Sequence, residues 1–173
     1  MLVPCMIVFS NILIVVATVA LTEVMSWAIH RYVMHGWAWR WHAGHHADDH
    51  EARHAGVQNG PQWNDLFALG PASISVALMW LDDWTYGPLF WVGTGMAVYG
   101  LLYLLVHEGL AHGRLPLTWR PRNRYLKRLV QAHRLHHAVR GRDGSVSFGF
   151  LYAPPIRHLR DELRRRRAVS TGD

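Results

Sequence analysis

Residues 87–112 read GPLFWVGTGMAVYGLLYLLVHEGLAH, an apolar run that leads directly into two histidines. Residues 87–106 carry no charge, and about 20 apolar residues are enough for a helix to cross a bilayer. This stretch therefore predicts a membrane-spanning helix with His107 and His112 at its far end. The chain has 173 residues, the size of one ordinary domain, and half of them are apolar.

Two further apolar stretches predict two more spans. Residues 3–28 are long enough, and Glu23 is their only charge. Because no basic residue precedes Arg31 and the stretch is too long for a signal peptide, we expect a retained helix. Residues 66–81 are short and contain Pro71, but the polar turn that follows predicts a hairpin with the span at 87–106. The sequence thus predicts an all-α, integral membrane helical bundle, with residues 1–173 as a single domain.

The basic residues predict how this bundle is oriented. All 18 Lys and Arg lie between 31 and 63 or after 106, and none lies near the turn at 82–86. The positive-inside rule then places 30–63 and 107–160 in the cytoplasm, as a histidine-rich, metal-binding cap. An even number of crossings between these two regions, which the spans at 66–81 and 87–106 provide, lets them meet.

Ten of the thirteen histidines form a repeated pattern, HxxxxH followed by HxxHH, that begins where a span reaches the cytoplasm. These residues are His30, His35, His42, His45, His46, His107, His112, His133, His136 and His137. Histidines three or four apart share one face of an α-helix, so each HxxHH is expected to point at one centre. A five-residue step turns an α-helix by about 140°, so each HxxxxH is expected to line two sides of a pocket. Ten ligands suit two ions.

Imidazole binds Zn, Cu, Fe or Ni, so the spacing alone does not name the metal. The single cysteine, Cys5, offers no thiolate site. Glu108 adjoins His107 and is a candidate to orient that ligand from behind.

Several other polar residues have two interpretations each. Asn64 and Asp65 either support ligands or, as we expect, cap the next helix. Glu23 is either functional or makes an interhelical hydrogen bond, with equal weight. His50 and His54 are expected in a solvated loop, and His158 is expected to be an ordinary surface or satisfied core residue rather than a ligand.

At this point the sequence resembles a known family, the fatty-acid-hydroxylase superfamily of membrane di-iron enzymes. Within it, the details resemble carotenoid hydroxylases of the bacterial β-carotene 3-hydroxylase type. The matching stretches are HRYVMHG (30–36), WHAGHH (41–46), YGLLY (99–103), YLKRL (125–129), AHRLHHAV (132–139) and VSFGFLYAPP (146–155). The resemblance extends over residues 5–160. Glu108 departs from the Asp common in the family, and the loop 47–63 looks longer than usual.

The resemblance implies a monooxygenase in the bacterial inner membrane. Two iron ions, held by the ten histidines, would use O2 and electrons from a ferredoxin-type donor. The reaction would hydroxylate C3 of β-ionone rings, converting β-carotene to β-cryptoxanthin and then zeaxanthin, or canthaxanthin to astaxanthin. The oligomeric state stays open.

Three alternatives remain. The first is a related di-iron hydroxylase or ketolase that acts on another lipid. The second is a non-enzymatic metal-binding or metal-transporting membrane protein, although a transporter would place ligands within its spans. The third is a zinc hydrolase with Glu108 as the general base.

The C-terminal third is strongly basic, and apolar residues at helical spacing predict an amphipathic surface helix over 156–167. Attraction to anionic lipid is favoured over docking of an acidic ferredoxin. Nucleic acid is not expected as a partner, because these residues border a membrane and no base-reading motif accompanies them. The small residues at 93, 95, 97 and 100 are expected to pack helices rather than to line a substrate path.

Overall fold

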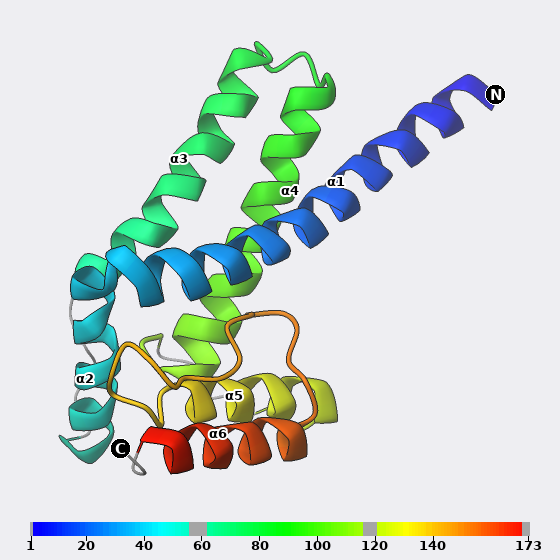
Figure 1. The fold of residues 1–173 in the computed structure, drawn as a ribbon. Coiled ribbons are helices and arrows are strands. Elements are labelled where there is room, and N and C mark those ends of the chain that lie inside the picture. Colours follow the sequence, from blue (N-terminus) through cyan, green and yellow to red (C-terminus); the bar gives the residue numbers. More distant parts are fainter. Residues whose placement is uncertain (1, 56–61, 116–120, 171–173) are drawn as a thin grey trace.

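The computed structural model describes residues 2–55, 62–115 and 121–170, and every regular element in these ranges is a helix (Figure 1). The α-helices are α1 (Leu2–Ala28), α2 (Trp39–Ala55), α3 (Leu66–Leu81), α4 (Pro88–Tyr103), α5 (Arg124–His136) and α6 (Ile156–Ser170). The shorter elements are the π-helices η1 (Ile29–Trp37) and η3 (Leu104–Ala111) and the 3-10 helix η2 (Trp63–Asp65). The predicted all-α architecture is confirmed.

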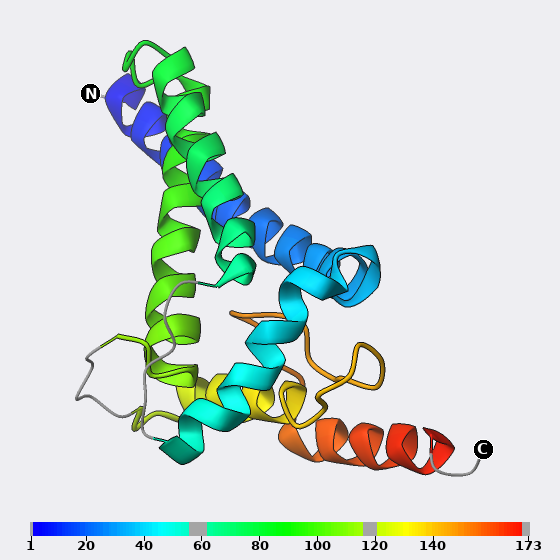
Figure 2. The same cartoon turned by 90° about the vertical axis from the view of Figure 1, so that its left-hand side faces the viewer.

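Within the described residues, three helical segments are long and apolar enough to cross a membrane: Met6–Trp37, Trp63–Leu81 and Pro88–Ala111. The second of them is the short span expected at 66–81, which η2 lengthens by three residues. Figures 1 and 2 show the N-terminus of α1 and the turn between α3 and α4 at the same end of the molecule, away from α5 and α6. This arrangement agrees with the predicted crossings.

Both α1 and α3 pack on α4 at glycines where the backbones approach closely. A Cβ at Gly93 would lie 2.7 Å from the carbonyl oxygen of Ser75, and one at Gly95 would lie 2.6 Å from Cβ of Thr18. The hydroxyl of Ser75 donates to the carbonyl of Gly93 over 2.7 Å, which ties α3 to α4. At these two positions the packing role expected for the small residues is confirmed. At Gly100 it is wrong, because an added Cβ would meet nothing within 4 Å.

The two π-helices continue α1 and α4 and carry the HxxxxH motifs. A π-helix joins residues five apart by backbone hydrogen bonds, as between the His112 N–H and the His107 carbonyl at 3.0 Å. The two histidines of each motif therefore lie on one face, rather than on the two sides that an α-helical step of about 140° predicts. The ring centroids are 5.3 Å apart for His30 and His35 and 4.5 Å apart for His107 and His112.

The cap lies beyond the ends of α1 and α4 that continue into η1 and η3. In the views of Figures 1 and 2, α2 runs down one side of the cap, and α5 and α6 lie across its bottom. Its core joins Leu159 and Leu163 of α6 to Leu129 and Ala132 of α5. The helix expected near 156–167 is therefore present and amphipathic. Its apolar face is covered by α5, so the expectation of an apolar face turned to the membrane surface is wrong.

Candidate metal centre

The ten predicted histidines come together between η1, η3, α2 and α5. Nine of them form two groups in which the potential ligand nitrogens all lie within 4.8 Å of one another. The first histidine group contains His30, His35, His42, His46 and His136, all buried. The second histidine group contains His45, His112, His133 and His137. The tenth, His107, adjoins the second group, since its Nε2 lies 3.3 Å from Nε2 of His112.

Each HxxHH motif contributes to both groups. His42 and His46 lie in the first group, but His45 lies in the second, where its ring centroid is 4.3 Å from that of His112. The second motif mirrors this, because His136 lies in the first group, and its Nε2 is 3.1 Å from Nε2 of His35. The expectation that each HxxHH points at one centre is therefore wrong. In each HxxHH motif the first and last histidines lie in one group and the middle histidine, His45 or His136, lies in the other.

In the first group the outward nitrogens all donate to oxygen atoms. Nδ1 of His30 donates to the Phe148 carbonyl at 2.9 Å, and Nδ1 of His42 to Oδ1 of Asn64 at 2.6 Å. The remaining carbonyl acceptors lie in the segment between α5 and α6. They are Arg142 for His35, Val139 for His46 and Val146 for His136, at 2.7–3.0 Å. Because an oxygen acceptor requires the proton on Nδ1, each Nε2 in this group presents a lone pair inward.

These inward lone pairs approach one another closely. Nε2 of His42 lies 3.2 Å from Nε2 of His30 and 3.2 Å from Nε2 of His46. Two unprotonated nitrogens at that distance repel each other unless a cation lies between them. Ligands about 2.1 Å from one ion are spaced in this way, since that is the usual metal–imidazole distance for zinc. The first group therefore fits a metal ion, and the second resembles it, with 2.7 Å between Nε2 of His112 and Nε2 of His133.

Burial keeps the cap imidazoles neutral. Loss of hydration lowers the pKa of His42, His133, His136 and His137 below the ordinary histidine value, and the neighbouring histidines lower it further. Neutral imidazole is the form that binds metals.

Three side chains support the ligands from behind. Asn64 holds His42, Gln62 accepts from Nδ1 of His45 at 3.0 Å, and Glu108 accepts from Nδ1 of His107 at 2.6 Å. The role expected for Glu108 is thus matched by its contacts. The expectation that Asn64 is only a cap is wrong, since this buried amide holds a ligand. The sequence motifs did not identify Gln62 as a partner of a ligand. Only its position shortly before Asn64 and Asp65 could have drawn attention to it.

Glu108 belongs to an ion-pair network. Arg114 donates to Oε2 of Glu108 at 2.7 Å and to both carboxylate oxygens of Asp65 at 3.0 Å. The hydroxyl of Tyr103 also donates to Glu108, at 3.1 Å. The hydrogen bond to Asp65 and the charge of Glu108 raise the pKa of Arg114 above its ordinary value. Asp65 also accepts from the Gln62 N–H at 2.9 Å, as part of a capping box that begins η2. Asp65 occupies the N-cap position of α3 as well, but its side chain makes no capping hydrogen bond there, so the expected cap of the 66–81 helix is found one short helix earlier.

Two of the remaining polar candidates, Glu23 and His158, are not part of either group. Glu23 makes the interhelical hydrogen bond, since the hydroxyl of Tyr99 on α4 donates to it at 2.9 Å. His158 is exposed, as expected. The side chains of Cys5, His50 and His54 fall outside the described residues. The backbone at His50 and His54 belongs to α2, so the loop expected at these two positions is wrong.

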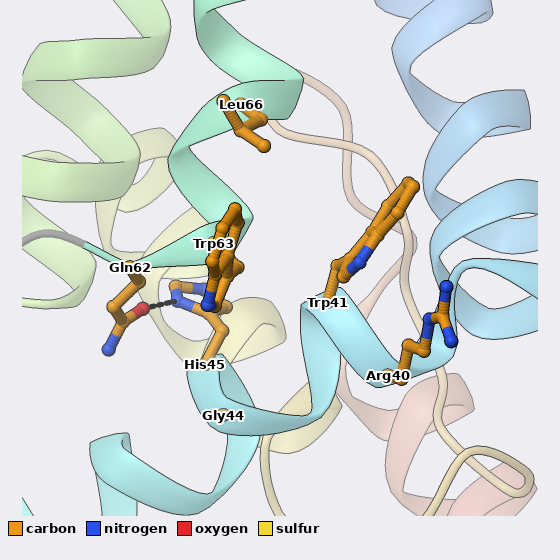
Figure 3. A pocket seen from close by; sticks show the side chains of 7 residues that line it. All are labelled: Arg40, Trp41, Gly44, His45, Gln62, Trp63 and Leu66. Carbon is orange, nitrogen blue, oxygen red and sulfur yellow. Dashed lines mark hydrogen bonds between the residues drawn. The ribbon is translucent and has the colours of Figure 1, made fainter.

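A cavity of about 380 Å³ opens beside the second group (Figure 3). Trp63 and Leu66 form one side, Trp41 and Arg40 the other, and His45, Gly44 and Gln62 also line it. His45, a member of the second group, is only 2% exposed and is bonded to Gln62, so little of this histidine faces the cavity. A second cavity, of about 10 Å³, adjoins His107 and His133 directly.

Comparison with known proteins places this site in a family. Residues 15–154 match the model described as fatty acid hydroxylase. A "Beta-carotene hydroxylase" of Pantoea ananas is 49% identical over 94% of this chain and 88% of its own length. One of Pseudescherichia vulneris is 51% identical over 90% of this chain and 84% of its own length.

A plant relative extends the comparison. The "Beta-carotene 3-hydroxylase 1, chloroplastic" of Arabidopsis thaliana is 31% identical over 74% of this chain and 39% of its own length. No match was found among solved structures. Because the family model matches most of this chain, and because relatives near 50% identity cover it almost completely, this chain belongs to the fatty acid hydroxylase family.

Proposed function

We propose that this chain is a membrane-bound monooxygenase that hydroxylates C3 of carotenoid β-ionone rings, converting β-carotene to β-cryptoxanthin and then zeaxanthin. The observation that carries the proposal is the pair of buried histidine groups with inward-facing nitrogens. This centre occurs in a chain about half identical to bacterial proteins named for β-carotene hydroxylation.

The ten histidines are proposed to hold two iron ions, one in each group. When bound, the iron pair supplies the activation of O2 that a C–H hydroxylation requires. In the first group, and at His45 and His107, oxygen acceptors behind Nδ1 keep Nε2 turned inward, and the burial of the groups excludes water. Since each group combines residues from both ends of the chain, we propose that spans and cap form one domain.

The balanced reaction consumes a C–H bond, O2, two electrons and two protons, and yields C–OH and water. The electrons must come from outside the chain, and we propose a reduced ferredoxin-type donor. The favoured docking surface is α6, at the end of the molecule away from the spans (Figure 1). Its side chains Arg157, Arg160, Arg164, Arg165 and Arg167 are exposed, and they suit an acidic partner.

A short route leads from α6 to the first histidine group. Nη1 of Arg166 donates to the Ser145 carbonyl at 2.7 Å. The next carbonyl, that of Val146, accepts from Nδ1 of His136 at 3.0 Å. Since α6 lies far from the spans and its apolar face is covered, this location supports the donor over anionic lipid as the partner of its arginines.

The membrane placement follows from the spans and the charges. Bacterial relatives and three membrane-type helices support an inner-membrane protein. The concentration of Lys and Arg in the cap supports a cytoplasmic location for the histidines. Carotenoids dissolve in the bilayer, so a site just below the ends of the spans can receive one end of such a molecule.

The alternatives make different predictions. A zinc hydrolase needs a carboxylate that can accept a proton beside the metal. Glu108 instead faces Arg114 and supports His107 from behind, which argues against that role. A ketolase, or a hydroxylase of another lipid, would use the same centre, and only the products separate these activities.

The deciding experiment expresses the chain in bacteria that accumulate β-carotene and separates the pigments by chromatography. The control is the His136→Ala/His137→Ala double variant, which removes one ligand from each group. We expect β-cryptoxanthin and zeaxanthin only with the intact chain. Unchanged β-carotene, with the protein present in the membrane, would refute the substrate, and 4-oxo products would identify a ketolase.

A further inference from the structure

The carboxylate of Glu23 lies within the first membrane-type segment, yet it is saturated with hydrogen bonds. Its Oε1 accepts the backbone N–H groups of Phe150, Leu151 and Tyr152 at 3.0, 2.9 and 2.9 Å. Its Oε2 accepts from the hydroxyl of Tyr99. A carboxylate in a span is costly unless it is satisfied in this way, and hydrogen bonds to a charged group are the strong ones. Glu23 therefore fixes the segment 148–152 against α1 and α4.

The contact is tight enough to dictate the residue at 149. A Cβ on Gly149 would lie 2.8 Å from Oε1 of Glu23 and 2.7 Å from the carbonyl oxygen of Tyr152. Only glycine leaves room for the carboxylate to approach the three N–H groups together. The segment is thus shaped around Glu23.

The segment held in this way covers the side of the histidine groups that faces the spans. The ring of Phe150 stacks on His30 of the first group, with centroids 5.3 Å apart and planes at 5°. It also meets His107, beside the second group, edge to face at 5.0 Å. Phe148 contacts His35 and His136, and its carbonyl holds His30. Phe150 therefore bridges the two groups from above.

The cavity beneath this cover is very small. It measures about 10 Å³, and Phe150, Gly149, His107 and His133 line it together with Val106, Ala111 and Leu129. That volume holds at most about one water molecule, so no hydrocarbon ring fits while Phe150 stays in place. Phe150 is only partly buried, so its side chain lies between the histidines and the outside of the protein.

We infer that the segment 148–152 is the membrane-side cover of the centre, with Glu23 as its positioning residue and Phe150 as the gate. The gate decides which bilayer-dissolved ring reaches the histidines. The ligand class is a flat, substituted cyclohexene ring at the end of a conjugated chain. This inference rests on the proposed function for the identity of that ring. The larger cavity between Trp41 and Trp63 is the competing entrance, and it ends at His45 and Gln62.

The positioning role of Glu23 is tested without substrate, by amide hydrogen exchange on the iron-loaded full chain in lipid nanodiscs. Glu23→Gln removes the charge that three N–H groups share, so exchange at residues 150–152 should accelerate about tenfold or more, equivalent to about 1.4 kcal/mol. The matched control is Thr22→Val, because Thr22 only bonds to the carbonyl of Thr18 in its own helix. Unchanged exchange in Glu23→Gln would overturn the positioning role.

The gate is tested by comparing kcat/KM for β-carotene and for canthaxanthin, whose rings carry an extra oxygen. Phe150→Ala should change the ratio of the two values by about tenfold, as expected when a pocket wall is removed. Phe150→Leu, which keeps an apolar cover, should change it less, and iron content should stay at the wild-type level in both. Trp63→Ala should leave the ratio unchanged.

Two outcomes would overturn the gate: a ratio unaffected by both Phe150 variants, or a shift that follows Trp63→Ala instead. Failure of the proposed function has a different signature. A wild-type chain that oxidises neither carotenoid would refute the substrate, while the amide-exchange result would still decide the role of Glu23.

Discussion

Replacing Glu108 by Gln tests the assignment of the ligands to two groups. Glu108 accepts from Nδ1 of His107 at 2.6 Å, and its other oxygen receives Arg114 at 2.7 Å. The substitution keeps the shape of the side chain but turns a charge-assisted hydrogen bond into a neutral one. Only the metal beside the second group should bind more weakly, because His107 adjoins that group alone.

The magnitude follows from what the substitution removes and what remains. Loss of a partner behind a metal-bound histidine typically lowers metal affinity about 10- to 100-fold, which corresponds to about 1.4–2.7 kcal/mol. Arg114 keeps its two-pronged ion pair with Asp65, so its charge stays compensated. We therefore expect the lower half of this range for Glu108→Gln.

The assay is a titration of metal-free protein in detergent with Co(II), followed by the absorption of the bound ion. The wild type should show two binding events, and Glu108→Gln should weaken one of them. The matched variant is Asn64→Leu, which removes the acceptor of His42 and should weaken the other event. If both variants weaken the same event, or both events equally, the division into two groups is refuted.

Four further predictions follow. His45→Ala should lose the metal of the second group, and His136→Ala should lose that of the first. Metal analysis of these variants and of His45→Ala/Asn64→Leu should show that the double variant loses metal from both groups, so that the loss caused by His45→Ala and the loss caused by Asn64→Leu add. Removal of metal by a chelator should lower the Tm, because the facing nitrogens lose the cation between them; an unchanged Tm would contradict the fit of the first group. Gly95→Val should destabilise the chain by about 1–3 kcal/mol through overpacking against Thr18, whereas Gly100→Ala should be neutral, and thermal unfolding in detergent compares the two. Arg157→Glu/Arg160→Glu should raise the KM for an acidic ferredoxin and weaken its salt dependence while leaving turnover with a chemical reductant intact; equal KM values would exclude this face of α6.

Much of the fold could be read from the sequence, because spans depend on length and polarity alone. The runs at 3–28, 66–81 and 87–106 predicted the three membrane segments, and the repeated HxxxxH and HxxHH motifs identified all ten clustered histidines. The geometry of the motifs could not be read in the same way. Regular α-helical periodicity places His42, His45 and His46 on one face, and it contains no sign that η1 and η3 are π-helices.

The partners of the ligands were hidden for a different reason. Three of the acceptors in the first group are backbone carbonyls of residues 139–146, and every residue has a carbonyl, so the sequence does not mark them. Leu159 and Leu163 predicted an amphipathic helix correctly, but periodicity does not say whether the apolar face meets lipid or protein. That choice depends on α5, which lies far away in the sequence.

The exchange of His45 and His136 also constrains how the protein is made. During synthesis, His30, His35, His42 and His46 emerge early, yet their group is completed only when His136 arrives from near the other end of the chain. The second group waits in the same way, since His133 and His137 join His45 and His112 only when α5 has been made. Neither half of the chain can assemble a full ligand set by itself. Metal insertion is therefore expected as a late step of biogenesis, after the last span has entered the membrane and the cap has closed.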